Sequence, residues 1–127
     1  MNGRCKMLFD FHTAKVDYDP QFDLLSIRRQ DCKVSYSLRF GSVAIDFHKN
    51  QPVGFEFADA EAFLKKLFNY PKLSKHLLSQ TTIGKIGFAE TRGNLIAFLV
   101  FVLPGKQQLE AKYVLPQVAR QELKVRA

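Results

Sequence analysis

Two consecutive hairpins between residues 33 and 57 predict the same buried face, and this agreement limits the possible folds more than any other feature. A glycine in the first position, as in Gly41-Ser42, is typical of a tight type II′ turn. That turn gives these apolar cross-strand pairs: Phe40–Val43, Leu38–Ile45 and Tyr36–Phe47. A second turn at Lys49-Asn50-Gln51, with Asn50 in the left-handed conformation, gives the pairs Phe47–Val53, Ile45–Phe55 and Val43–Phe57. Each hairpin supports the other, because a slip of one residue would turn the apolar face to water.

After Phe57 the spacing of apolar residues changes from two to about 3.6, which predicts an amphipathic helix. We expect Asp59 to be its N-cap. Pro71 should end the helix, because a proline disfavours helical geometry at the residue before it. The apolar stripe of this helix is Phe63, Leu64, Leu67 and Phe68. A second, shorter helix is expected over residues 72–80.

Alternating segments on both sides of this region predict further strands. The first runs from residue 7 to residue 16 or 18 and returns, after a turn around Pro20, along residues 24–29 with Leu25 and Ile27 in the core. Residues 83–115 predict a second antiparallel set. In that set, a turn at Gly93-Asn94 pairs Ile86 with Phe101 and Phe88 with Leu99. A further turn at Pro104-Gly105-Lys106 gives the pairs Phe101–Leu109, Leu99–Ala111 and Ala97–Tyr113. Residues 117–127 fit either a frayed helix or a basic tail.

These elements predict an α+β fold. We expect an antiparallel meander sheet of about seven strands, in one set or in two, with one or two helices packed on it. The chain has 127 residues, of which 46% are hydrophobic, and this is enough for a core without metal or disulfides. The sequence therefore favours a single domain over residues 1–127.

The net charge of +7 is unevenly placed along the chain. Residues 1–58 carry +1, and residues 59–127 carry the other +6. A basic balance favours a polyanion partner such as a nucleic acid, through contacts with phosphates. However, no run of adjacent basic residues is longer than Arg28-Arg29 or Lys65-Lys66, and this pattern favours a solvated surface.

The cysteines and apolar runs bear on compartment and partners. The spacing of Cys5 and Cys32 matches no short metal motif, and we expect both to be reduced thiols. The alternative is a disulfide bond between the first two strands, in an exported protein or one from a hyperthermophile. The longest apolar run, Leu95–Leu103, has nine residues, whereas a membrane-spanning helix needs about 20. The first residues lack the apolar segment of a signal peptide. We therefore expect a cytoplasmic protein with no membrane partner and no cofactor.

Two blocks of the sequence resemble a known family. The first is Tyr18-Asp19-Pro20 followed by residues 22–27, and the second is Pro52–Ala60 with its valine-glycine-phenylalanine-glutamate motif. In this order and spacing they are similar to a family of small prokaryotic proteins of unknown function, and the match covers residues 16–64. Some members are thought to accompany toxin genes. The resemblance therefore implies an antitoxin-like role.

The face of the hairpins opposite the core carries the candidate site residues. Its polar side chains are Ser35, Ser37, Arg39, Asp46, His48 and Glu56, and Ala44 and Gly54 leave its middle shallow. Asp46 and His48 are two residues apart on one strand, so their side chains point the same way and can hold a divalent metal or orient an imidazole as a base. Asp10 and His12 form a parallel pair that could complete the ligand set. Alternating polar residues are also typical of any half-exposed strand.

Three function classes follow from these patterns. The leading one is an interaction or regulatory module that forms a homodimer or binds another protein. It rests on the segment Leu95–Leu103, which is apolar on both faces. Its second row, formed by Ile96, Phe98, Val100 and Val102, needs a cover from the helices or from a second copy. The alternatives are a small metal-dependent or acid/base hydrolase that uses the polar face, and a nucleic-acid-binding protein.

Overall fold

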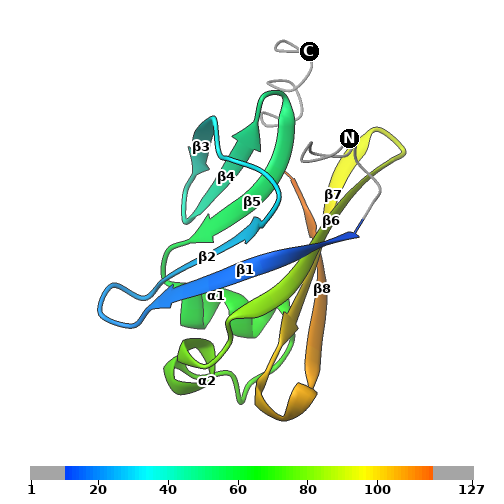
Figure 1. Ribbon diagram of the computed structural model, residues 1–127. Helices are drawn as coiled ribbons and strands as arrows, with labels where there is room; N and C mark the ends of the chain where they lie inside the picture. The colour runs from blue at the N-terminus through cyan, green and yellow to red at the C-terminus, as the bar shows by residue number, and fades with distance from the viewer. Residues whose placement is uncertain (1–10, 116–127) are drawn as a thin grey trace.

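The computed structural model describes residues 11–115 and contains one eight-stranded antiparallel sheet with two helices (Figure 1). The strands are β1 (Phe11–Asp19), β2 (Leu24–Arg29), β3 (Tyr36–Phe40), β4 (Val43–His48), β5 (Gln51–Phe57), β6 (Ile83–Thr91), β7 (Asn94–Val102) and β8 (Gln108–Val114). The helices are α1 (Ala60–Leu67) and α2 (Lys75–Ser79), with a 3₁₀ turn η1 (Pro104–Lys106) between β7 and β8.

The strands lie in the order β3-β4-β5-β2-β1-β6-β7-β8. This order confirms the α+β class and the antiparallel sheet, but there are eight strands and not about seven. The sheet is also not a simple meander, because β5 pairs with β2 and β1 pairs with β6. The two predicted strand sets form one sheet, because β1 pairs with β6 on one side and with β2 on the other. The sheet curls around the core, and both helices lie on its concave side (Figure 1).

The register of the first hairpin is confirmed, and the register of the second is confirmed in part. Phe40, Leu38 and Tyr36 face their predicted partners on β4. Between β4 and β5, Ile45 and Val43 also pair as predicted. However, the ladder shifts between Asp46 and Phe47, so that Phe47 faces Pro52 and not Val53. The turn residue with positive φ is Lys49 (56°), not Asn50. A β-bulge of this kind adds one unpaired residue to a strand, which pattern alone does not reveal.

In the second set, the β6–β7 register differs from the prediction by two residues. Ile86 faces Leu99 and Phe88 faces Ala97, because the turn is Arg92-Gly93 and not Gly93-Asn94. Arg92 (φ 51°) and Gly93 (φ 81°) both have positive φ, as a type I′ turn requires. The pairs predicted between β7 and β8 are confirmed.

Helix α1 begins differently from the prediction. Asp59 is at the N-cap, but its φ is 50° and its side chain makes no capping bond. Instead, Asp23 in the β1–β2 turn accepts hydrogen bonds from the N–H groups of Ala60 (3.0 Å, to the carbonyl) and Glu61 (3.1 Å, to the carboxylate). The Tyr18 hydroxyl donates to the same carboxylate (2.7 Å), and burial together with this carboxylate raises the pKa of Tyr18. The start of α1 is therefore tied to the β1–β2 turn.

Both helices pack on core-facing residues of the sheet. The Phe68 ring lies 4.8 Å from that of Phe101, and the Phe63 ring lies 5.2 Å from that of Phe57. Helix α2 is shorter than the predicted 72–80; the Ser74 side chain caps it by accepting a hydrogen bond from Leu77 N–H (3.1 Å). Since α1 and α2 occupy the concave side, neither covers the outward face of the sheet.

Some predictions concern residues that the structure does not describe. Met7, Asp10 and the tail 117–127 lie outside residues 11–115, as does Cys5. Cys32 is part of a disulfide bond, which corrects the expectation of two reduced thiols. No helix within residues 11–115 has the length and apolar character needed to cross a membrane.

Candidate functional site

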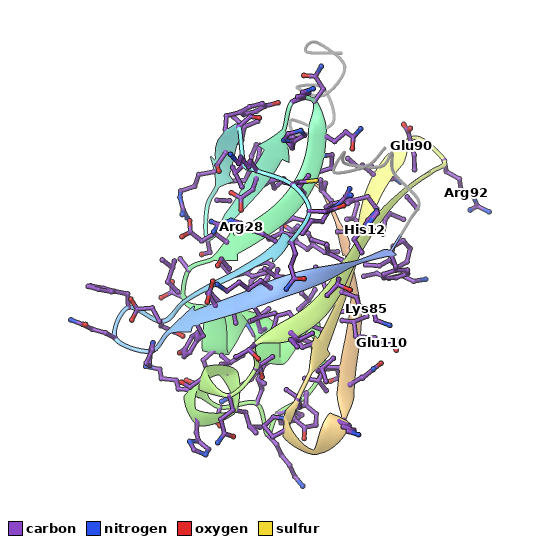
Figure 2. All side chains as sticks on the ribbon, in the orientation of Figure 1. His12, Arg28, Lys85, Glu90, Arg92 and Glu110 are labelled. Carbon is purple, nitrogen blue, oxygen red and sulfur yellow. The ribbon has the colours of Figure 1, made fainter. Side chains whose placement is uncertain are left out.

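The polar face is formed by aligned residues of five neighbouring strands, β1, β2, β5, β4 and β3. In one row across these strands lie Lys15, Arg28, Gly54, Asp46 and Ser37. The next row is Asp17, Ser26, Glu56, Ala44 and Arg39. The predicted opposition of Ser37 to Asp46 is therefore confirmed, as are the positions of Arg39 and Glu56 on either side of Ala44. Figure 2 labels Arg28 on this part of the sheet.

Asp46 is buried although it lies on the outward face. Its side chain is 2% exposed. One carboxylate oxygen accepts a hydrogen bond from Arg28 Nε (2.6 Å), and the other accepts one from Ser37 Oγ (2.5 Å). Arg28 thus reaches from β2 across β5 to β4, and the two Asp46 oxygens have donors from two different strands, β2 and β3.

Gly54 makes this reach possible. It lies between Arg28 and Asp46, and a Cβ atom added to it would be 2.7 Å from Arg28 Cγ and 2.6 Å from the Ile27 carbonyl oxygen. Both distances are shorter than van der Waals contact, so any larger residue would displace the arginine or separate the two strands. The ion pair between Arg28 and Asp46 therefore requires a glycine at position 54.

The metal-ligand candidates are not all brought together. His48 Nδ1 donates to the Lys33 carbonyl oxygen (2.7 Å). His12 has the same parity on β1 as the buried Ala14, so it faces the concave side, opposite to Asp46. Three strand spacings, about 14 Å, separate β1 from β4. Within residues 11–115 no group of three His, Cys, Asp or Glu side chains is placed to hold a metal. Asp10 lies outside that range, so its part in a site stays a prediction.

The other polar-face candidates have partners within the same face or in the adjoining turns. Arg39 Nη2 donates to Glu56 Oε1 (3.2 Å) in a partly exposed ion pair. Ser35 Oγ accepts a hydrogen bond from Lys49 N–H (3.0 Å) at the β4–β5 turn. The bonds at Asp46, Arg39 and Ser35 thus link strands β2, β3, β4 and β5 and the β4–β5 turn to one another.

Sequence reasoning missed Arg28, which is the main partner of Asp46. The pattern indicated only a basic pair, Arg28-Arg29. Knowing that β2 lies beside β5 would have placed Arg28 directly across from Gly54. The missing signal was therefore a contact between strands that are distant in the chain.

Arg29 forms a second ion pair, on the core side of β2. Its Nε and Nη2 donate to the two oxygens of Asp31 (2.9 and 2.7 Å), and its own side chain is almost fully buried. These hydrogen bonds are the main reason why the pKa of Asp31 is held below its usual range. Planar two-bond contacts of this kind are the stronger form of ion pair.

We expect this pair to make stability depend on acid pH. Because the pKa of Asp31 is lower in the folded state, the stabilisation is fully present above the unfolded-state value near 4 and is lost as pH falls through the folded value. Asp31→Asn should therefore flatten the acid side of a plot of melting temperature against pH. The exposed Asp17→Asn variant is the charge-matched control. Equal slopes for wild type and Asp31→Asn would contradict this role.

A different surface covers the outward side of the other half of the sheet. We call it the outer apolar patch: Phe11, Ile83, Ile96, Phe98, Val102 and Val114. Phe11 and Val114 are each 56% exposed. A pocket of about 290 Å³ lies within it, beside Phe98 and Val100, and its charged rim is formed by Glu110 and Lys112. Figure 2 labels Lys85 and Glu110, which lie in one row on either side of Val100.

Comparison with protein-family models, with curated proteins and with solved structures found no match. The resemblance of residues 16–64 to small prokaryotic proteins, and the antitoxin-like role that it implies, therefore stay predictions.

Proposed function

We propose that this protein is an interaction module that works as a homodimer. The observation that carries the proposal is the outer apolar patch, which extends to β8 at the end of the sheet on the side opposite to both helices. Apolar surface of this kind commonly marks a protein interface. A two-fold pairing of identical chains is the commonest arrangement of soluble oligomers.

The polar face supports an interaction role over a hydrolytic one. A general base or a metal ligand needs a side chain that is available to the substrate or the ion. Asp46 instead uses both carboxylate oxygens for Arg28 and Ser37. Glu56 accepts a hydrogen bond from Arg39. The ionisable groups with the most suggestive spacing thus stabilise the sheet.

The mass of the protein in solution tests this proposal. Light scattering on a sizing column at about 50 µM should give twice the chain mass of 14.6 kDa, with a shift toward the single-chain mass on dilution. Phe98→Glu, which places a charge within the outer apolar patch, is expected to lower the dimer fraction. Phe22→Glu changes an exposed phenylalanine in the β1–β2 turn and serves as the control. A single-chain mass for the wild type at 200 µM would overturn the proposal.

Nucleic-acid binding is the second candidate, and one observation favours it. Residues 62–89 contain five lysines and no acidic residue. Three of these lysines, Lys66, Lys72 and Lys75, are exposed at the helical end of the molecule. Lysines can bind phosphates from such a surface without reading sequence.

Salt dependence tests this second candidate. If these three lysines contact phosphates, affinity for duplex DNA should fall about 40-fold between 50 and 200 mM salt. Changing all three to glutamate should abolish the gel shift, whereas Lys15→Glu on the polar face should not. Absence of a shift at 50 mM salt with micromolar protein would exclude the candidate.

A further inference from the structure

Within residues 11–115, strand β8 is an open edge of the sheet. It is the last strand in the sheet order, it has seven residues, and it contains no proline. Its ladder with β7 is continuous over its whole length. Natural proteins usually protect such edges with prolines, bulges, very short strands or charged side chains, because free N–H and C=O groups pair readily with another strand. Of these devices β8 itself has only charged side chains, Glu110 and Lys112.

The backbone groups at this free edge belong to the even-numbered residues. Leu103 N–H bonds the Gln107 carbonyl (2.7 Å), and Leu115 N–H bonds the Leu95 carbonyl (2.9 Å), so odd-numbered residues on the β8 side bond toward β7. Hydrogen-bonded and non-hydrogen-bonded pairs alternate in an antiparallel ladder. The free groups are therefore those of Gln108, Glu110, Lys112 and Val114.

These residues are self-complementary in one register. A two-fold axis at Ala111, the middle of β8, places Glu110 opposite the partner's Lys112 and Lys112 opposite the partner's Glu110. It also overlaps the full strand, because Gln108 then faces the partner's Val114. An axis at position 110 or 112 would instead bring two glutamates or two lysines together. Opposite charges across a strand pair stabilise it, and like charges destabilise it.

We propose that β8 pairs antiparallel with β8 of a second copy, about a two-fold axis at Ala111. The inference rests on the proposed function and places the interface of that homodimer at the β8 edge, which borders the outer apolar patch. Phe98→Glu would then act through Lys112, the residue opposite Phe98 on β8, whose ammonium lies 5.8 Å from the Phe98 ring. In this pairing Glu110 and Lys112 each exchange two backbone hydrogen bonds with their opposite residues. The two sheets become continuous, and the outer apolar patches of both copies lie on the same face. The other edge, β3, has five residues, and its one charged side chain, Arg39, already pairs with Glu56.

Charge reversal tests the register. Glu110→Lys alone makes two lysines face each other at both symmetric positions, and Lys112→Glu alone makes two glutamates do so. Each single variant should raise the dimer dissociation constant about tenfold or more, measured by sedimentation equilibrium. An equimolar mixture of the two variants should dimerise as tightly as the wild type, because every facing pair is again opposite in charge. Lys85→Glu, on the same face but on β6, is the matched control and should leave the constant unchanged.

A cysteine at the axis gives a second readout. In the proposed dimer, Ala111 lies opposite Ala111 of the second copy in a non-hydrogen-bonded pair. The Cα atoms of such a pair are about 4.5 Å apart, which is within the range that a disulfide spans. Ala111→Cys should therefore cross-link into a dimer on a non-reducing gel, above the background of the wild type with Cys5 and Cys32. Glu110→Cys faces the partner's Lys112 and should not cross-link.

The outcomes separate this inference from the proposed function. A wild-type dimer that neither single charge reversal weakens would place the interface elsewhere and overturn the β8 pairing, while the proposed homodimer would stand. A wild type that stays monomeric would overturn both. If the single variants weaken the dimer but their mixture does not restore it, the charges do not face each other and the register is wrong.

Discussion

Phe55→Ala is expected to lower the free energy of unfolding by about 3–5 kcal/mol, the usual cost of truncating a buried phenylalanine. Phe55 is fully buried on β5 and lies between Ile27 and Ile45 of the neighbouring strands. Its ring is also 5.8 Å from the rings of Phe88 on β6 and Tyr113 on β8. The side chain therefore joins both halves of the curled sheet, and its loss leaves a cavity that the surrounding strands can close only in part.

Urea denaturation at neutral pH measures this loss through the midpoint and the slope of the transition. Phe22→Ala is the control, because Phe22 is 69% exposed in the β1–β2 turn and its removal should change stability by less than about 0.5 kcal/mol. Similar midpoints for the two variants would show that Phe55 does not lie in the core.

Short-range register could be predicted from the sequence, because turn chemistry and alternation both act between neighbouring residues. The pairs around Gly41-Ser42 and those between β7 and β8 are correct for this reason. The β6–β7 pairs are wrong by two residues, because a shift of two leaves every side chain on its own face. Alternation alone cannot distinguish the two turns, and the choice depends on the positive φ angles of Arg92 and Gly93.

Contacts between distant segments could not be predicted in this way. The cap of α1 comes from Asp23, in a turn more than 30 residues earlier in the chain. The position of β2 beside β5 likewise depends on the packing of the whole sheet. For this reason Ser37 was correctly placed opposite Asp46, but the pattern did not indicate which arginine binds the Asp46 carboxylate. The partner that buries its carboxylate, Arg28, lies on β2.

Removing that partner is the second change with a large expected effect. Arg28→Met keeps most of the side-chain length but removes one donor to the Asp46 carboxylate and leaves the hydrogen bond from Ser37. Leaving a buried charge without its counterion costs about 3–5 kcal/mol. We expect about 2–3 kcal/mol here, because the Arg28 side chain is itself 41% exposed and water can partly replace it.

A double-mutant cycle isolates the interaction. Asp46→Leu alone leaves Arg28 able to reach solvent, and Arg28→Met/Asp46→Leu replaces both charges with apolar groups of similar size. Since replacing a whole buried ion pair is often neutral, the double variant should be more stable than Arg28→Met alone. Urea midpoints of the four proteins give the coupling energy, which we expect to be at least about 1 kcal/mol. Strictly additive losses would mean that Arg28 stabilises the sheet through its aliphatic contacts over Gly54, and that its charge contributes little.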